Sequence, residues 1–85
     1  MRSEAEIQSI VYESIVATFR FPIDRVGQAT TASDVDGWDS VSTSKLIFAI
    51  EDRVGVELPI EDMLTARNLG EMISVVLRFL NSRGK

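Results

Sequence analysis

The sequence is most informative at Gly37-Trp38-Asp39-Ser40-Val41, where a stretch of turn residues gives way to a helical pattern. Asp and Ser both favour the first positions of a helix, because their short side chains accept hydrogen bonds from amides that have no partner inside the helix. Gly55 suits the left-handed turn that ends many helices. A helix is therefore predicted from about Ser40 to Gly55, with the apolar stripe Val41, Leu46, Ile47, Ile50 and Val54.

Two more long helices are predicted, one on each side of this helix. The first covers residues 4–19: Ser3 and Glu6 match a capping box, and Pro22 prevents further propagation. The last begins at the cap formed by Asn68 and Glu71. The stripe of the first helix is Ile7, Ile10, Val11, Ile15 and Phe19; that of the last is Leu69, Met72, Ile73, Val76, Leu77 and Leu80, ended by Asn81, Ser82 and Gly84.

The segments between these helices lack a sustained period. Residues 20–39 form a long loop with at most one short helical turn, and loops of this length in compact domains usually have a function. Residues 56–59 are extended, and residues 60–65 form one short turn. An all-α bundle follows, with three main helices, a short helix and a long first loop. We expect the loop to be fastened to the core by Phe21, Ile23, Val26, Val35 and Trp38.

The amino-acid composition excludes several classes of site and function. The 85 residues include no cysteine and no histidine, which excludes disulfides, thiolate metal sites and the commonest general base, so catalysis by this chain alone is not expected. The formal net charge is −4: residues 1–39 carry −4, residues 40–65 carry −3, and residues 66–85 carry +3. Such an acidic surface disfavours nucleic acid, including a helix-turn-helix DNA-binding role, and attracts basic partners.

Neither a membrane segment nor a metal site is indicated. The amino end is charged and lacks a secretory signal, and the longest apolar run, residues 46–50, is too short to span a bilayer. A cytoplasmic protein is therefore expected. A calcium loop counted from Asp34 fails, because its sixth position is Asp39 rather than Gly and its twelfth is Lys45 rather than Glu.

The segment from Gly37 to Pro59 resembles the acyl carrier protein family. That family has a G-x-D-S-L core, here Gly37-Trp38-Asp39-Ser40-Val41, followed by an apolar helix that closes on an acidic cluster and a short extended segment. The order of the other helices matches over nearly the full length. The resemblance implies a single carrier domain over residues 1–85, which we expect to be a monomer.

The resemblance also implies a cofactor and partners. Ser40 would carry 4′-phosphopantetheine, transferred from coenzyme A by a phosphopantetheinyl transferase. Acyl-activating or acyl-transfer enzymes and synthase enzymes would then dock on the helix that begins at Ser40. A phosphodiester at this position would lie against free backbone amides and the positive end of the helix dipole. The carboxylates offered to basic partners would be Asp39, Glu51, Asp52, Glu61 and Asp62.

The sequence departs from the better-known fatty-acid carriers early in this helix. Acidic residues are common there in those carriers, whereas this chain has Ser42, Thr43, Ser44 and Lys45, and Val41 replaces the usual Leu. These changes favour a dedicated lipid or polyketide-type pathway. A peptidyl or aminoacyl carrier remains an alternative, as does a helical interaction module in which Ser40 is only a cap.

Other roles were considered for individual side chains. A hydrolase with Ser40 as nucleophile and Asp39 beside it is not expected, because the chain offers no plausible general base. Phe48, beside the apolar stripe, is either buried or part of a partner contact. Trp38 is expected to anchor the loop, and Met63 and Met72 to fill the core.

Overall fold

The computed structural model describes residues 3–83, apart from the side chains of Ser40 and Arg83. In this part of the chain every regular element is helical: α1 (Glu4–Phe19), α2 (Ser40–Val54), α3 (Ile60–Leu64) and α4 (Leu69–Arg83). The first loop holds two single turns of 3₁₀ helix, η1 (Ile23–Arg25) and η2 (Ala32–Asp34), where at most one turn was expected. The predicted all-α bundle of three main helices and one short helix is confirmed.

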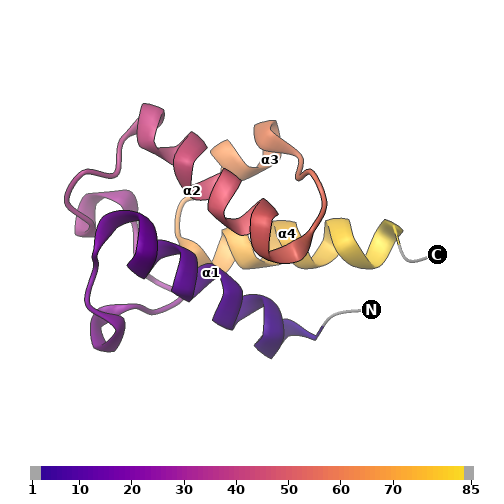
Figure 1. The fold of residues 1–85 in the computed structure, drawn as a ribbon, viewed down its shortest axis with the longest axis horizontal. Coiled ribbons are helices and arrows are strands. Elements are labelled where there is room, and N and C mark those ends of the chain that lie inside the picture. The colour runs from indigo at the N-terminus through magenta and orange to yellow at the C-terminus, as the bar shows by residue number, and fades with distance from the viewer. Residues whose placement is uncertain (1–2, 84–85) are drawn as a thin grey trace.

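The long helices pack around one core. α1 packs against α2 and α4, and α3 bridges α2 and α4. The start of α1 and the end of α4 lie at the same end of the molecule, and the first loop lies at the opposite end (Figure 1). The core is formed by the buried residues Ile7, Val11, Ile15, Leu46, Ile47, Ile50, Val54, Met63, Leu69, Met72, Ile73 and Val76, with Phe21, Val35 and Leu58 from the connecting segments.

The helix ends agree with the capping signals in the sequence. The Ser3 side chain accepts a hydrogen bond from the Glu6 amide at 3.2 Å and starts α1. α1 ends at Arg20, which adopts the left-handed conformation with φ 56°, two residues before Pro22. α2 ends at Gly55, where φ is 78°. Local hydrogen bonding at the termini therefore fixes the bounds of the helices.

Two residues expected in the core are exposed instead. Val41 is 76% exposed and Ile23 is 60% exposed. Val41 precedes Leu46 by five residues, a spacing that turns it away from the buried face, whereas Thr43 precedes Leu46 by three and is buried. Ile23 lies in the single turn η1, which has no buried residue. The buried stripe of α2 therefore begins at Thr43, and the loop is held by the buried Phe21 and Val35 together with the partly buried Val26 and Trp38.

The start of α4 is bonded to the first loop. The Asn68 side chain accepts a hydrogen bond from the Glu71 amide at 2.8 Å, as the sequence predicted. The amides of Leu69 and Gly70 donate to the carbonyl oxygens of Thr30 and Gln28 at 3.0 and 2.8 Å. The long loop therefore satisfies helix amides that would otherwise lack partners.

The other end of α4 differs from the prediction. Asn81 and Ser82 belong to the helix, which continues to Arg83, and Gly84 lies outside the described residues. Among residues 3–83, no helix has both the length and the apolar character that a membrane span requires.

Candidate functional site

The start of α2 is held by Asp39. This residue is the N-cap, with extended backbone, and its Oδ1 atom accepts a hydrogen bond from the Ser42 amide at 2.8 Å. Its carbonyl oxygen accepts from the Thr43 amide at 3.0 Å and so closes the first helical turn. Ser40 is the first helical residue, and its side chain lies outside the described part of the structure. The cap position is thus filled by Asp39 rather than by Ser40.

The hydrogen bond from the Ser42 amide also affects the ionisation of Asp39. The hydrogen bond from the Ser42 backbone amide favours the ionised carboxylate and lowers the pKa of Asp39 below its ordinary value. A negative group at this end also interacts favourably with the helix dipole. Asp39 therefore stays charged at neutral pH, directly beside Ser40.

The turn before α2 depends on Gly37. Its φ is 86°, in the left-handed region that residues with a Cβ atom rarely adopt. The next amide, that of Trp38, donates to the carbonyl oxygen of Val35 at 3.2 Å. This turn brings the chain from the loop to the helix start and positions the indole of Trp38.

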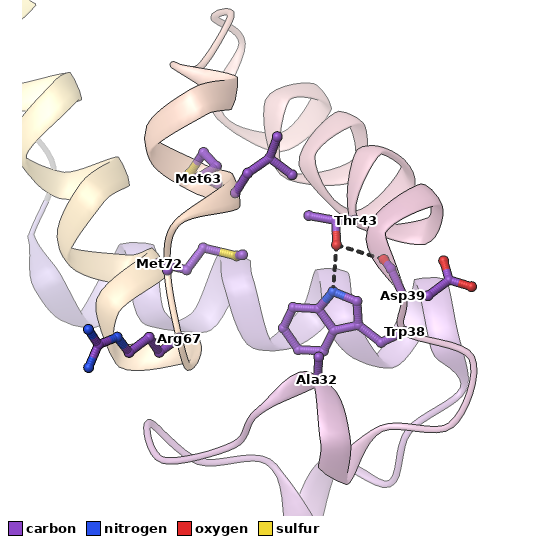
Figure 2. A pocket seen from close by; sticks show the side chains of 9 residues that line it. Ala32, Trp38, Asp39, Thr43, Met63, Arg67 and Met72 are labelled. Carbon is purple, nitrogen blue, oxygen red and sulfur yellow. Dashed lines mark hydrogen bonds between the residues drawn. The ribbon is translucent and has the colours of Figure 1, made fainter.

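Two contacts hold that indole in place, and a further hydrogen bond fixes Thr43, the partner in one of them. Its Nε1 atom donates a hydrogen bond to Thr43 Oγ1 at 2.9 Å, and the Thr43 hydroxyl donates to the Asp39 carbonyl oxygen at 2.8 Å. The two hydrogen bonds appear as dashed lines in Figure 2. The ring is also stacked on Phe19 of α1, with centroids 5.8 Å apart and an interplanar angle of 21°. Trp38 is partly buried and anchors the loop, as the sequence predicted.

A pocket of about 530 Å³ opens beside this indole. It lies where η2, the start of α2, α3, the segment that leads into α4 and α4 itself come together, and Figure 2 shows the indole facing Met63 and Met72 across it. Both methionines are fully buried, as expected of core residues, and both also form the inner wall of the pocket. The lining residues are Ala32, Trp38, Asp39, Thr43, Met63, Leu64, Ala66, Arg67 and Met72.

A second hollow, of about 310 Å³, borders the start of α2 on the side of α1. Its lining is mostly polar or charged: Thr18, Phe19, Arg20, Asp36, Gly37, Ser42 and Lys45. The helix start thus borders two hollows, one mainly apolar and one in which polar or charged side chains outnumber apolar ones. From the sequence, Trp38 was expected to anchor the loop, Asp39 to face basic partners and the two methionines to fill the core, and none of them was expected to line a pocket. Thr43 and Arg67 were missed as pocket residues, because only the packing of five segments of the chain shows that they meet.

The acidic residues fall into two groups. Asp52, Glu61 and Asp62 are exposed, as a role in docking requires. Glu51 is half-buried, and its Oε2 atom accepts a hydrogen bond from the Leu58 amide at 2.7 Å. Its carboxylate therefore ties the end of α2 to the segment before α3, a structural role that the sequence did not indicate.

The outer face of α2 also carries apolar side chains. Phe48 is 58% exposed, and Val41 lies on the same face because the two are seven residues apart. Leu64 and Ile60 of α3 are exposed as well. Ser44 and Lys45 are exposed between Val41 and Phe48. This surface therefore combines uncovered apolar groups with carboxylates.

Comparison with known proteins identifies related sequences. Residues 11–76 match the family described as "Phosphopantetheine attachment site". The chain is 30% identical over 76 residues to an acyl carrier protein of Chlorobium phaeovibrioides and to one of Chlorobium luteolum. Each of these alignments covers 89% of this chain and 97% of the relative.

A shorter segment is more similar to another relative. The chain is 47% identical over 38 residues to an acyl carrier protein homolog of Ureaplasma parvum, an alignment that covers 45% of this chain and 49% of the relative. The segment shared with this relative is thus about half of each protein.

Proposed function

This chain belongs to the acyl carrier protein family, and from that premise we propose that Ser40 is the residue that carries its 4′-phosphopantetheine group. The protein is a carrier rather than an enzyme. Its polypeptide has no cysteine, so the prosthetic group supplies the thiol on which acyl groups are carried as thioesters. Ser40 stands in the Gly37–Val41 segment that matches the core motif of the family.

The surroundings of Ser40 fit such a group. The neighbours Asp39 and Val41 are both exposed, so a transferase can reach the start of α2. The positive end of the helix dipole favours a phosphodiester there. Since Asp39 supplies the cap, a hydroxyl at position 40 can be modified without loss of the capping hydrogen bond. This capping arrangement is the single observation that best supports the assignment, because it removes the need for Ser40 as a cap.

The partners follow from the family in general terms: a phosphopantetheinyl transferase and enzymes that handle acyl groups. We further propose that these enzymes dock on the outer face of α2 and on α3. The exposed Val41 and Phe48 would meet an apolar partner surface, and Asp52, Glu61 and Asp62 would meet basic residues around it.

We also propose that this carrier serves a dedicated lipid or polyketide-type pathway. This proposal is supported by Lys45, an exposed cation at a place where fatty-acid carriers commonly have an acidic residue. A cation here would repel a basic docking patch.

The attachment site is tested by intact-protein mass spectrometry after incubation with coenzyme A and a broad-specificity phosphopantetheinyl transferase. We expect the wild type to gain one phosphopantetheine and Ser40→Ala to gain none. Ser44→Ala is the matched control, because it removes a serine from the exposed face of the same helix and is expected to be modified like the wild type. Modification of Ser40→Ala, or none of the folded wild type, would contradict the proposal.

The role of Lys45 in the choice of pathway is tested by reversing the charge at this position. Lys45→Glu is expected to raise kcat/KM severalfold with a partner enzyme of the fatty-acid synthase type, because it replaces a repulsive group by an attractive one. Arg78→Glu on α4 is the control, since it changes the net charge equally at an exposed site on another helix. Equal kcat/KM values for the wild type and Lys45→Glu would show that Lys45 does not set partner choice.

A further inference from the structure

The smaller hollow, on the α1 side of the start of α2, has the chemistry of an anion site. Its volume is about 310 Å³, and its lining includes two cations, Arg20 from the end of α1 and Lys45 from the second turn of α2. Thr18 and Ser42 add hydroxyl groups, which can donate hydrogen bonds to an anion. Asp36 is the single carboxylate among the lining residues, so the side chains leave one positive charge in excess.

Two helix ends also border this hollow, and their dipoles offset each other. The carboxyl end of α1 contributes about half a negative charge, and the amino end of α2 contributes about half a positive charge. The charged side chains therefore decide the sign of the potential. Arg20 and Lys45 are both exposed, and neither side chain has an ion-pair or hydrogen-bond partner within residues 3–83. An anion that enters the hollow can thus reach two cations that are not already paired.

Arg20 occupies a backbone position that favours a different residue. It ends α1 in the left-handed conformation with φ 56°, and among the described residues it alone has a positive φ without being glycine. A Cβ atom is disfavoured in this conformation, which is why glycine is common directly after a helix. Backbone stability alone would therefore favour glycine, and an arginine at this position points to a use for its side chain.

The hollow also lies close to the proposed attachment residue. Gly37 and Ser42 line it, and they are three residues before and two residues after Ser40. Lys45 follows Ser40 by five residues, a rise of about 7.5 Å, and long side chains of a helix point back toward its amino end. A phosphodiester on Ser40 would add a negative charge beside the carboxylate of Asp39. The two cations of the hollow can compensate this added charge.

We propose that Arg20 and Lys45 bind the phosphodiester of the 4′-phosphopantetheine group and so hold the first part of the arm on the α1 side of α2. The inference rests on the proposed function, since the group must be attached to Ser40. The guanidinium can donate two parallel hydrogen bonds to a phosphate, whereas the lysine acts as a point charge. Because the phosphate is attached to the same chain, its effective concentration at the hollow is high and weak contacts suffice. Arg20 and Lys45 are positioning residues that set the direction in which the arm leaves the carrier.

The test compares the thermal stability of the unmodified protein with that of the protein bearing the arm. Coenzyme A and a broad-specificity phosphopantetheinyl transferase attach the arm, and intact mass confirms one arm per chain. The measured quantity is the Tm of the modified form minus that of the unmodified form. We expect this Tm difference to be lower than in the wild type by about 1–5 °C in Arg20→Gln and in Lys45→Gln at low salt. High salt should remove most of this loss, because it screens exposed charges.

Further variants separate phosphate binding from general effects on stability. Asp36→Asn removes the carboxylate of the hollow, so the Tm difference should increase rather than decrease. Arg20→Gly should raise the Tm of the unmodified form, because it relieves the left-handed backbone, and still lower the Tm difference. Arg20→Lys keeps the charge and should retain most of the difference. Arg78→Gln is the control, since it removes a positive charge from an exposed position on α4, outside the hollow.

The phosphorus atom of the arm gives a second measurement that does not depend on stability. The phosphorus NMR resonance of the modified protein is recorded for the wild type and for each variant. The resonance should move in Arg20→Gln and in Lys45→Gln, because each removes a group bound to the phosphate. It should stay in place in Arg78→Gln.

The outcomes separate this inference from the proposed function. If intact mass shows no arm on the wild type, the proposed function fails and this inference fails with it. If the arm is attached but the Tm difference and the phosphorus resonance are the same in all variants, the carrier function stands and the hollow does not bind the phosphodiester. An equal loss in Arg78→Gln and in the variants of Arg20 and Lys45 would show that only the net charge matters, which would also overturn the inference.

Discussion

Asp39 is the N-cap of α2, and it lies directly before Ser40, the proposed attachment residue. Its carboxylate accepts the hydrogen bond from the Ser42 amide and so completes the cap of α2. We expect Asp39→Ala to lower Tm by several degrees at neutral pH, because an amide of the first turn loses its partner. Asp39→Asn is expected to lower Tm less, because an Asn side chain also caps helices but carries no charge to interact with the dipole. Thermal denaturation followed by circular dichroism measures both.

The pH dependence of these variants follows from the direction of the pKa shift. The pKa of Asp39 is lowered in the folded protein by the Ser42 amide. Its contribution to stability is therefore complete above the unfolded value of about 3.9 and is lost as the pH falls through the lower folded pKa. The Tm difference between wild type and Asp39→Asn should accordingly be constant from pH 7 to about pH 5 and shrink below pH 4. A Tm difference that shows no decrease down to the lowest pH at which both proteins stay folded would mean that the charge of Asp39 does not contribute to stability.

At the scale of elements, α4 depends on the first loop through a close approach at Gly70. A Cβ atom at this position would lie 3.2 Å from both the Cβ atom and the carbonyl oxygen of Gln28. The Gly70 amide donates to that same carbonyl oxygen at 2.8 Å, so the loop cannot move away without loss of the bond. We expect Gly70→Ala to lower the free energy of unfolding by ~1–3 kcal/mol, as overpacking does, in urea denaturation.

Gly27 provides the matched control for this prediction. A Cβ atom there would meet nothing within 4 Å, and its backbone is outside the left-handed region. Gly27→Ala should therefore be neutral or stabilise by up to ~1 kcal/mol through the unfolded state. Equal effects of the two substitutions would show that the contact between loop and α4 is not tight.

The elements also show what local sequence can predict. The bounds of α1 and α2 follow from caps and from Pro22, because these signals act within a few residues. The exposure of Val41 depends on its register in α2, which a count of apolar residues did not resolve. The role of Glu51 could not be predicted, since its partner, the Leu58 amide, comes into reach only after the chain has turned at Gly55.

At the scale of the whole molecule, negative and positive charges are concentrated in different segments of the chain. Residues 40–65, which include α2 and α3, carry a formal charge of −3, and residues 66–85 carry +3. Residues 1–39 are acidic as well, with −4, so charge disfavours only the approach of a basic partner to α4, and the proposed attachment at Ser40 directs such a partner to α2 and α3. Asp52→Asn with Glu61→Gln should lower kcat/KM for phosphopantetheinyl transfer severalfold at low salt, with a smaller effect at high salt, because exposed charges act mainly on association. Steady-state kinetics at two ionic strengths measure this.

A matched variant on α1 tests whether position matters. Glu6→Gln with Glu13→Gln removes the same number of exposed negative charges from another helix. Its kcat/KM should stay close to that of the wild type. A loss equal to that of the variant on α2 and α3 would indicate that only the net charge matters. The sequence suggested this acidic surface, whereas the pocket required the structure, because its lining comes from five segments.

The place of Trp38 makes this protein its own optical reporter. It is the single tryptophan of the chain, so all indole emission comes from the wall of one pocket two residues before Ser40. Any group that fills the pocket would replace water beside the indole, and the emission maximum would move to shorter wavelength. The entry of such a group could then be followed in real time on the unlabelled wild-type protein, without a probe attached to it.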